Sequence, residues 1–446
     1  MARMRIQPAL RLRGRVRVPG DKSISHRAAI IAALAAPGGR SRLTNYATSA
    51  DCAATLDCLA ALGVWIEREG SNVEIEGLGT AWTHAPRAPL DCGNSGTTMR
   101  LLAGLLAGQS FNSTLTGDAS LRSRPMKRII EPLNLMGARI SSDDGGRAPL
   151  RIEGRRPLVG ISYALPVASA QVKSCLLLAG LNAEGTSEII EACGATRDHT
   201  ERLLSLFGVD LRTEWKNYEG RSVPSVSVQT PARLQSHDCD IAGDISSAAF
   251  FLAAAALLSG SDLTLEQVGL NPTRTQILDT LQRLGATVAV GNEREESNEI
   301  FGELRVRGSG GLVPGETGAN VLRGALVAGL IDELPILCVV GTQIEGGLEI
   351  RDAAELRVKE TDRISAMVKN LRAMGAEVEE YADGLRVAGP TPLSGARLEA
   401  YGDHRIAMAC AVAALISDGE SELEGAESVA VSFPEFFEML ESVTER

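Results

Sequence analysis

A pattern that recurs along the chain constrains the fold more than any other feature of the sequence. Each copy has a polar start, a run of small and aliphatic residues, and a glycine that closes the run. The copies begin near Asp21, Gly93, Val167, Gly243, Asp332 and Gly402. They close at Gly38, Gly108, Gly180, Gly260, Gly346 and Gly419. Because glycine commonly ends helices in the left-handed conformation, each copy predicts a helix.

A second, amphipathic helical pattern lies between these copies and ends in Leu-x-x-(Leu/Met/Phe)-Gly-(Ala/Val). It closes at Gly63, Gly137, Gly208, Gly285 and Gly375, and a sixth copy at 434–443 lacks the glycine. Alternating runs such as 64–67 with 73–76, and 378–380 with 385–387, predict β-hairpins after these helices. Single strands are expected between the helices, at 113–116, 187–191, 262–266 and 347–352. Six copies of helix, strand, helix and hairpin predict a modular α/β fold.

The six repeats divide naturally into three plus three, with the boundary at 237–241. The segment 11–18 predicts an extra strand, which a permuted arrangement would assign to the last repeat. We therefore predict two domains, residues 21–239 and residues 1–20 plus 240–446, with crossovers near Gly20 and Asp240. Two crossovers would form a hinge that lets the domains open and close. A continuous solenoid is the alternative, and it is less favoured because no capping repeats are visible.

Charge and composition argue against several functional classes. The chain has 446 residues, a formal net charge of −11 and only 4% aromatic residues, which disfavours nucleic acids and anionic membranes as partners. Its eight cysteines show no C-x-x-C spacing, so we expect reduced thiols and a cytoplasmic protein. The basic N-terminal segment lacks the apolar core of a secretory signal, and the longest apolar run, 248–258, is too short to span a membrane.

Cations and hydroxyls gather at the expected helix starts of this acidic chain. The segment PGDKSISHR carries Lys22, Ser23 and Arg27. Comparable residues at the other starts are Asn94–Thr98 with Arg100, Arg124, Ser169, Gln171, Lys173, Arg197, Arg357, Lys359, Glu360, Arg363, Asp403, His404 and Arg405. Because helix N-termini attract anions, convergence of these ends would create a site for phosphates and carboxylates. The alternative is a set of solvated polar helix starts, which are common.

Acid–base candidates lie in the second half of the chain. Asp332 and Glu333 precede an expected helix, where an N-cap pair is the alternative explanation. Glu360 lies between Lys359 and Arg363, where a surface salt bridge is the alternative. The sequence has no Walker A loop, no G-x-G-x-x-G after a strand, and no H-E-x-x-H or clustered His and Cys, so no cofactor or metal is predicted.

Taken together, several motifs in this order resemble the 5-enolpyruvylshikimate-3-phosphate (EPSP) synthase family, also called 3-phosphoshikimate 1-carboxyvinyltransferases. They are PGDKSISHR, GNSGTTMR, SRPM, ASAQVKS, DELP, RVKETDR and GDHRIAM, and the resemblance covers residues 14–437. It implies a two-domain inverse α/β barrel in which each domain contains three βαβαββ repeats. It also implies transfer of the enolpyruvyl group of phosphoenolpyruvate to the 5-hydroxyl of shikimate 3-phosphate, through a tetrahedral intermediate, on the shikimate pathway to chorismate and aromatic amino acids. A monomer without cofactor or metal is implied.

The same resemblance implies roles for individual residues. Contacts with shikimate 3-phosphate are implied for Lys22, Ser23, Arg27, Ser169, Gln171, Arg197, Asp332 and Lys359. Contacts with phosphoenolpyruvate are implied for Lys22, Gly96, Arg124, Gln171, Arg363 and Arg405. Asp332 resembles the base for the 5-hydroxyl, Glu360 resembles the group that protonates the methylene carbon, and Lys22 is the third implied catalytic residue.

Val431 and Glu355 depart from one branch of the family and resemble its more divergent bacterial branch. Gly96, which some herbicide-tolerant members replace by Ala, predicts that glyphosate competes with phosphoenolpyruvate. UDP-N-acetylglucosamine enolpyruvyl transferase is the nearest alternative, but Ser23 follows Lys22 where that family has Asn, and 111–128 lacks its loop Cys. A non-catalytic anion-binding scaffold is disfavoured by the presence of Lys22, Asp332 and Glu360. An RNA-phosphate cyclase is disfavoured by the acidic charge.

Overall fold

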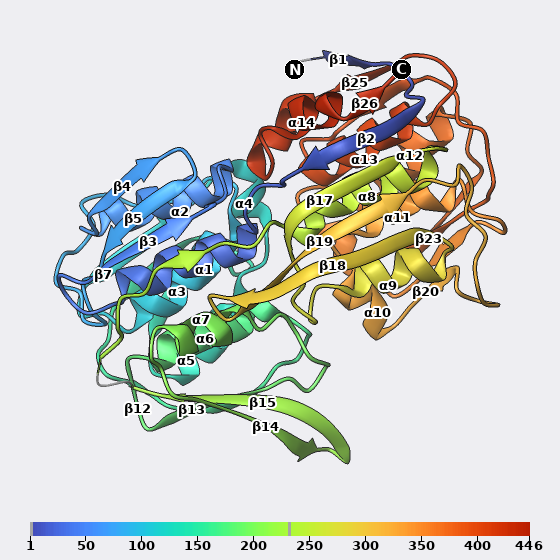
Figure 1. Ribbon diagram of the computed structural model, residues 1–446. Helices are drawn as coiled ribbons and strands as arrows, with labels where there is room; N and C mark the ends of the chain where they lie inside the picture. The colour runs from blue at the N-terminus through green and yellow to red at the C-terminus, as the bar shows by residue number, and fades with distance from the viewer. Residues whose placement is uncertain (1–2, 231–232) are drawn as a thin grey trace. The chain divides into compact units, whose positions relative to one another are not determined.

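The chain divides into two compact units in the computed structural model, which describes residues 3–230 and 233–446. Unit 1 comprises Met1–Pro19, Ala242–Glu295 and Ile300–Arg446, and unit 2 comprises Gly20–Ile241 with Glu296–Glu299. Three sheets, each served by its own helices, form the framework of each unit (Figure 1). The expected α/β fold built from six repeated elements is therefore confirmed.

Unit 2 contains three four-stranded sheets of the same topology. The first is β16 (Cys239–Asp240), β3 (Arg40–Thr44), β5 (Asn72–Glu76) and β4 (Ile66–Glu69). The second is β6 (Leu90–Asp91), β7 (Asn112–Thr116), β9 (Arg147–Glu153) and β8 (Arg139–Asp143). The third is β11 (Ser162–Ala164), β13 (Thr186–Ile190), β15 (Arg221–Gln229) and β14 (Leu211–Tyr218). In each sheet the first two strands are parallel and the last two form an antiparallel hairpin. Strands β10 (Leu158–Val159) and β12 (Ala183–Glu184) form a separate two-stranded parallel sheet.

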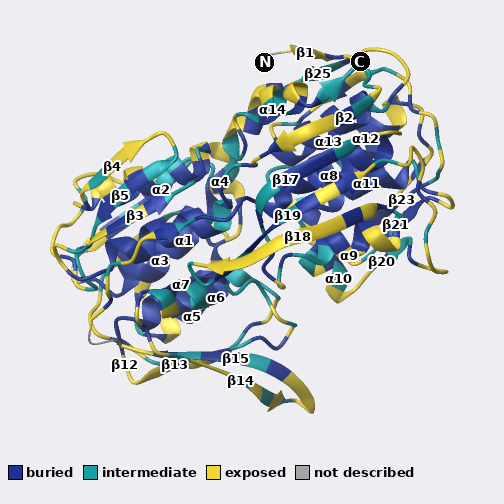
Figure 2. Ribbon diagram, in the orientation of Figure 1, coloured by how far each residue is buried: buried dark blue, intermediate teal, exposed yellow. Residues whose placement is uncertain are grey.

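Among the described residues, the helices of unit 2 follow the repeats, with two in the first repeat, three in the second and two in the third. They are α1 (Lys22–Ala33) and α2 (Ala50–Ala61), then α3 (Gly96–Ala107) with α4 (Ala119–Ser123) and α5 (Lys127–Leu135), then α6 (Ala170–Gly180) and α7 (His199–Leu206). Helices α1, α3 and α6 are almost wholly buried, whereas α2, α5 and α7 bury one face (Figure 2). The small and aliphatic composition of the first helix in each repeat explains this difference, since it has no polar face to leave in water.

Unit 1 repeats the plan with altered edges. Its first sheet is β18 (Thr287–Glu296), β19 (Glu299–Arg307), β17 (Asp262–Gly269), β2 (Arg11–Val16) and β26 (Thr444–Glu445). The second is β20 (Val321–Leu322), β21 (Leu348–Ile350), β23 (Gly384–Val387) and β22 (Val378–Tyr381). The third is β1 (Arg3–Ile6), β25 (Ser421–Glu424) and β24 (Arg397–Glu399). Its helices are α8 (Ile245–Leu257), α9 (Gln276–Arg283), α10 (Ala325–Gly329), α11 (Leu334–Gly341), α12 (Arg363–Ala373), α13 (His404–Leu415), α14 (Phe436–Ser442) and the 3-10 helices η1 (Ala354–Val358) and η2 (Ala426–Val431). The buried helices α8, α11 and α13 pack together inside the sheets.

The extra strand near the N-terminus does not join the main sheet of the last repeat, although its first residues pair antiparallel with β26 at the end of that repeat, where Arg11 is opposite Glu445. Strand β2 pairs in parallel with β17 of the fourth repeat, where Arg13 is opposite Asp262. It is β1 that joins the last repeat, antiparallel to β25, and it replaces the hairpin strand that this repeat lacks. The first repeat is completed in turn by β16, which lies far along the chain from β3. The expected pairing with the last repeat is thus confined to β26, because the sequence pattern of a strand does not select its distant partners.

The close crossing of α3 and α6 depends on a missing side chain. A Cβ atom added to Gly104 would lie 2.1 Å from the backbone oxygen of Cys175, which is far inside van der Waals contact. Both helices are fully buried at this point. The crossing therefore requires glycine at position 104, because two helix backbones approach closely only where side chains are absent.

Candidate active site

The cations at the start of α1 contact side chains of other elements in unit 2. Asp21 caps the helix by accepting a hydrogen bond from the Ile24 amide at 2.9 Å. Lys22 Nζ lies 2.9 Å from Asp51 Oδ2, and both side chains are mostly buried. Sequence analysis did not single out Asp51, although its place in the first turn of α2 made it a helix-start residue like the others.

Arg27 is buried and ties three helices of unit 2 together. Its Nε donates to Thr200 Oγ1 at 2.7 Å, Nη2 donates to Ser174 Oγ at 3.0 Å, and Nη1 donates to the Ser23 carbonyl oxygen at 2.8 Å. These three partners lie on α7, α6 and α1. These three partners are uncharged, and Arg27 is only 3% exposed.

A buried polar chain runs beneath these residues and links the starts of α1, α2 and α3. His26 Nδ1 lies 2.6 Å from Thr55 Oγ1, which lies 2.6 Å from Thr98 Oγ1. Thr98 Oγ1 in turn donates to Ser95 Oγ at 2.8 Å, and Ser95 caps α3. Burial, reinforced by the charges of Lys22 and Arg27, lowers the pKa of His26 well below its usual value, so the ring is neutral.

Residues of the second and third repeats meet around the first turn of α3. Gln171 Nε2 donates to Thr97 Oγ1 at 2.9 Å, while Arg100 Nη1 donates to Gln171 Oε1 at 2.5 Å. A Cβ atom added to Gly96 would lie 2.9 Å from Arg100 Nη1 and 3.5 Å from Arg124 Nη1. The structure therefore brings together three predicted residues, Gly96, Arg124 and Gln171, together with Arg100.

The other predicted residues of unit 2 lie at helix starts or in the loops before them. Arg124 is buried between α4 and α5, and its Nη2 donates to Asn94 Oδ1 at 2.6 Å and to Ser120 Oγ at 3.2 Å. Ser169 caps α6 by accepting from the Val172 amide at 3.4 Å. Arg197 lies in the irregular segment before α7 rather than within the helix.

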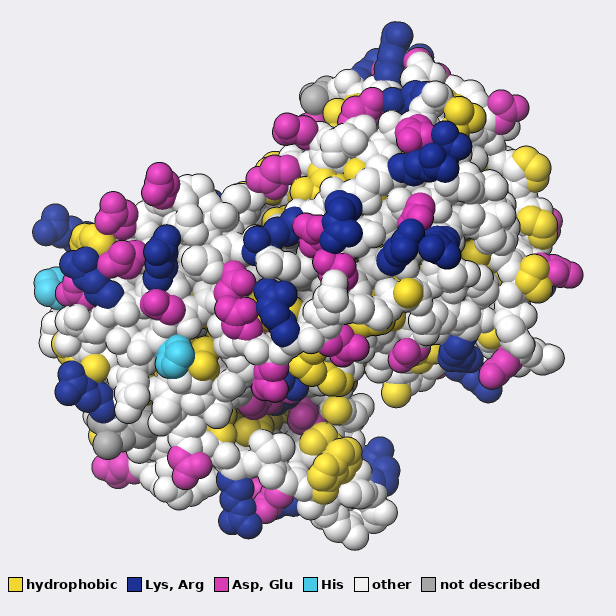
Figure 3. Space-filling model, in the orientation of Figure 1, with side chains coloured by type: hydrophobic (Ala, Val, Ile, Leu, Met, Phe, Trp, Pro, Cys, Tyr) yellow, Lys and Arg dark blue, Asp and Glu magenta, His cyan; other side chains and the backbone are white. Residues whose placement is uncertain are grey.

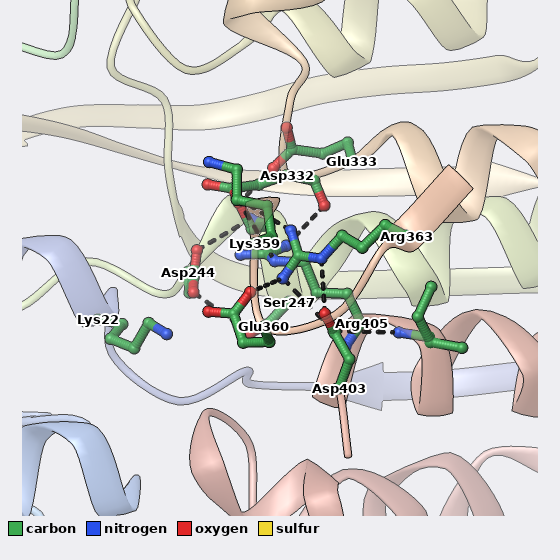
Figure 4. Close-up of polar contacts among 12 residues, drawn as sticks. Lys22, Asp244, Ser247, Asp332, Glu333, Lys359, Glu360, Arg363, Asp403 and Arg405 are labelled. Carbon is green, nitrogen blue, oxygen red and sulfur yellow. Dashed lines mark hydrogen bonds and ion pairs between the residues drawn. The ribbon is translucent and has the colours of Figure 1, made fainter. Parts of the chain in front are cut away.

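In unit 1 a single arginine organises three carboxylates (Figure 4). Arg363, the first residue of α12, is only 2% exposed. Its Nε lies 2.8 Å from Asp403 Oδ2, Nη2 lies 2.6 Å from Glu360 Oε2, and Nη1 lies 3.7 Å from Asp332 Oδ1. Burial alone would lower the pKa of the Arg363 guanidinium, but the charges of Asp403, Glu360 and Asp332 outweigh burial and raise it. The arginine is therefore permanently charged.

Asp332 lies between two guanidinium groups. Arg405 Nε is 3.7 Å from Asp332 Oδ1, and Arg405 Nη1 donates to the Asp332 carbonyl oxygen at 2.9 Å. Arg363 approaches the same Oδ1 atom. Lys359 is placed differently, because its Nζ lies 3.4 Å from Glu355 Oε1 at the surface. The segment RVKETDR does not start one helix: η1 ends at Val358, and Lys359 and Glu360 occupy the turn before α12.

The neighbouring Glu333 belongs to a buried network that sequence analysis missed. Glu333 makes no side-chain cap to α11, so the N-cap explanation fails for it, and its Oε1 instead accepts a hydrogen bond from Ser246 Oγ. Arg274 Nη2 donates to the same Ser246 Oγ at 2.8 Å and lies 3.4 Å from Asp244 Oδ1. The Asp244 position at a repeat start was a usable signal, whereas nothing in the sequence marked Arg274.

The surface of the described residues shows mixed charge in the view of Figure 3, with Lys and Arg side chains among Asp and Glu. On the outer sheet of unit 1, Arg15 pairs with Glu266 and Glu303, and Arg305 pairs with Asp262. Within the described ranges we find no group of three or more His, Cys, Asp and Glu side chains arranged to hold a metal ion. None of the helices at 3–230 and 233–446 has both the length and the apolar character needed to cross a membrane.

Comparison with known proteins gives a consistent result over the full chain. The family described as EPSP synthase (3-phosphoshikimate 1-carboxyvinyltransferase) matches residues 6–440. A 3-phosphoshikimate 1-carboxyvinyltransferase of Desulfitobacterium hafniense is 48% identical, covering 99% of this chain and 98% of that protein. A 3-phosphoshikimate 1-carboxyvinyltransferase of Koribacter versatilis is also 48% identical, covering 100% of this chain and 100% of that protein. A solved EPSP synthase from Acinetobacter baumannii superposes with a TM-score of 0.84 at 40% identity, covering 100% of this chain and 98% of that one.

Proposed function

The chain belongs to the EPSP synthase (3-phosphoshikimate 1-carboxyvinyltransferase) family, and we propose from this membership how its own residues share the reaction. The protein transfers the enolpyruvyl group of phosphoenolpyruvate to shikimate 3-phosphate in the shikimate pathway. Similarity to the sister UDP-N-acetylglucosamine transferases is thereby set aside, and so is a non-catalytic role. The proposal concerns the residues that bind each substrate and those that move protons.

Shikimate 3-phosphate is assigned chiefly to residues of unit 2. We assign it to Lys22, Ser23, Arg27, Ser169, Gln171 and Arg197 of unit 2, with Asp332 and Lys359 of unit 1. The support is the local setting of Arg27, whose guanidinium is surrounded by hydroxyl and carbonyl oxygens. A guanidinium forms charge-assisted hydrogen bonds, which suit it to bind a phosphate.

Phosphoenolpyruvate is assigned to Lys22, Gly96, Arg124, Gln171, Arg363 and Arg405. Three of these meet at the start of α3, where backbone N–H groups and the helix dipole favour an anion. Arg363 offers a second support: its buried Nη1 has no hydrogen-bond partner among the described residues, so a donor remains available for an anionic oxygen. Buried donors normally find partners, which makes this one a candidate contact for the substrate carboxylate or phosphate.

The Arg363 cluster is the observation that carries the proton chemistry. In the addition step Glu360 gives its proton to the methylene carbon of phosphoenolpyruvate, while Asp332 accepts the proton of the attacking 5-hydroxyl. The carbon–oxygen bond then formed gives a tetrahedral intermediate. In the elimination step the Glu360 carboxylate takes a proton back from the new methyl group, the carbon–carbon double bond forms again, and the carbon–oxygen bond to phosphate breaks, which releases inorganic phosphate. Lys22, Arg363 and Arg405 offset the negative charge of both substrates.

Each step uses side chains of this chain and its two substrates, so the proposal involves no cofactor or metal. We further propose that the protein works as a cytoplasmic monomer without nucleic-acid or membrane partners. Glyphosate is proposed to compete with phosphoenolpyruvate beside Gly96. Full activity in millimolar glyphosate would overturn that last point.

The test is phosphate release from the purified protein mixed with phosphoenolpyruvate and shikimate 3-phosphate. We expect release only when both substrates are present, and a loss of at least about 100-fold in Asp332→Asn and Lys22→Ala. Two control substitutions in half-buried surface ion pairs, Asp262→Asn and Lys216→Ala, are expected to keep the wild-type rate. Release with UDP-N-acetylglucosamine in place of shikimate 3-phosphate, or unchanged rates in both site variants, would contradict the proposal.

A further inference from the structure

We propose that Lys173, Glu191 and Glu201, which we call the Lys173 cluster, are positioning residues that hold the segment carrying Arg197. The inference rests on the proposed function, because there Arg197 contacts shikimate 3-phosphate. None of the three is assigned to substrate. Their effect on the reaction is indirect, through the conformation of residues 193–198.

The three residues meet in the interior of unit 2. Lys173 Nζ lies 2.6 Å from Glu201 Oε1 and 3.1 Å from Glu191 Oε1, and the Lys173 side chain is 1% exposed. Lys173 lies in the first turns of α6, Glu191 directly follows β13, and Glu201 lies near the start of α7. One ammonium group therefore joins three successive elements of the third repeat.

The Lys173 cluster also forms hydrogen bonds with Thr196, the residue before Arg197. Glu191 Oε1 accepts hydrogen bonds from the Thr196 amide at 2.8 Å and from Thr196 Oγ1 at 2.5 Å. Lys173 Nζ donates to the Thr196 carbonyl oxygen at 3.4 Å. Both backbone groups of Thr196 and its hydroxyl are thus held from within the protein. The surrounding segment has no helix or strand, and Gly194 has a positive φ of 113°, so it depends on such contacts for a fixed shape.

The charge balance of the cluster points to positioning rather than to stability. Burial alone would lower the pKa of Lys173, but Glu201 and Glu191 outweigh burial and raise it, so the ammonium stays charged. Burial raises the pKa of Glu201, whose Oε2 has no hydrogen-bond partner among the described residues. A buried ion cluster of this kind stabilises a fold no better than apolar side chains of similar size. Its geometric specificity is what apolar packing does not supply.

A neighbouring set of contacts ties the same two helices in register. Ser174 Oγ lies 2.6 Å from Thr200 Oγ1, and both accept from Arg27. Lys173 and Glu201 are the adjacent residues on α6 and α7. The start of α6, with Ser169 and Gln171, and the segment with Arg197 are therefore positioned together.

The experiment compares affinities for the two substrates in variants of the full chain. Thr196→Val removes the hydroxyl that Glu191 accepts and changes no charge. We expect a 3- to 10-fold rise in KM for shikimate 3-phosphate, the size of one lost hydrogen bond. Lys173→Met removes the ammonium group but keeps a side chain of similar volume. For this variant we expect KM for shikimate 3-phosphate to rise about 10- to 100-fold. For both variants KM for phosphoenolpyruvate is expected to stay within twofold, and calorimetry without phosphoenolpyruvate should give the same loss of shikimate 3-phosphate binding.

The matched controls separate positioning from general loosening of the fold. Thr213→Val and Lys216→Met make the same chemical changes on exposed β14 and are expected to leave both KM values unchanged. Glu191→Gln keeps an acceptor for Thr196, so it should retain more shikimate 3-phosphate affinity than Glu191→Ala. Equal rises in both KM values, or no difference between Glu191→Gln and Glu191→Ala, would overturn the inference.

Arg197→Ala distinguishes failure of the inference from failure of the proposed function. If Arg197→Ala weakens shikimate 3-phosphate binding while Thr196→Val and Lys173→Met leave it unchanged, only the positioning role is overturned. If Arg197→Ala has no effect on binding, the assignment of Arg197 fails and the inference fails with it. Thr196→Val keeps the test decisive even if the buried Lys173→Met variant does not fold.

Discussion

The two units use the same repeat but surround their arginines differently at the proposed substrate residues. In unit 2, Arg27 and Arg124 donate to hydroxyl, amide and carbonyl oxygens. In unit 1, Arg363 faces three carboxylates. In the proposed function this difference divides the work: the arginines of unit 2 bind the substrate anions, and Arg363 orients the carboxylates that exchange protons with the substrates. Two predictions test this division, and two more test the packing of unit 2 and its stability at low pH, from the largest effect to the smallest.

Glu360→Gln tests the proton-transfer role proposed for unit 1. The amide retains an oxygen for Arg363 but carries no transferable proton, so kcat should fall by about 10²- to 10⁴-fold. Both KM values should stay within about threefold, because the amide is nearly the same shape. Steady-state phosphate release measures both quantities. The exposed Glu380→Gln, which only loses a surface pair with Arg357, is the control, and a rise in KM at unchanged kcat would reverse the assignment of tasks.

Arg124→Gln should affect the anion-binding side instead. The substitution removes a buried guanidinium that donates to Asn94 and Ser120, and with it the proposed charge-assisted contact with phosphoenolpyruvate. We expect its KM to rise about 10- to 100-fold, with a smaller change in kcat. Arg122→Gln, on the exposed side of α4, should behave as wild type. A variant whose KM for phosphoenolpyruvate is unchanged would argue that unit 2 does not bind this substrate through Arg124.

The packing of the two units differs as well, and Gly104→Ala tests it. Unit 2 brings α3 and α6 together at Gly104, whereas α8 and α13 of unit 1 contain alanines but no glycine. The added methyl group would push against the Cys175 carbonyl, and we expect a loss of about 1–3 kcal/mol in the free energy of unfolding. Gly291→Ala, with open space around it, should change stability by less than about 0.5 kcal/mol. Equal urea midpoints for the two variants would contradict the account of the crossing.

The smallest predicted effect concerns pH. The folded-state pKa of His26 is depressed, chiefly by burial, so the folded protein does not take up the proton that the unfolded chain binds below about pH 6.5. Stability should therefore fall as the pH drops below that value, by up to about 1.4 kcal/mol per pH unit. His26→Asn removes this contribution, and urea unfolding between pH 7.5 and 5.5 should show a shallower slope. The exposed His84→Asn should keep the wild-type slope, and a His26 variant with that slope would refute the prediction.

Local features of the fold were predictable because glycine and apolar spacing determine where helices end and which face they bury. The expected strands at 113–116 and 187–191 correspond to β7 and β13, each shifted by one residue at its start. Pairing between distant strands was not predictable: β2 was assigned to the last repeat, but it pairs with β26 of that repeat only at its first residues and otherwise with β17. The break between η1 and α12 was also missed, since the charged residues of RVKETDR show no helix-ending signal.

The candidate residues could be named from the sequence, but their partners could not. Asp332, Glu360 and Asp403 are distant from one another in the chain and meet only because two helix starts and a loop converge on Arg363. The same holds for Arg274, which no motif marks and which reaches Ser246 and Asp244 through the fold. The roles assigned to the substrate-binding residues stay predictions until the variants are measured.

The exchange of β2 and β16 affects the order in which a ribosome can complete this protein. The first sheet of unit 2 needs only strands up to β16, so it can close once residue 240 has emerged from the ribosome. Strands β1 and β2 must wait for β25, β17 and finally β26 near residue 445. Unit 2 therefore matures first as an insertion, while the N-terminal strands remain unpaired through most of synthesis. During that interval their exposed edges are the part of the nascent chain most in need of protection from aggregation.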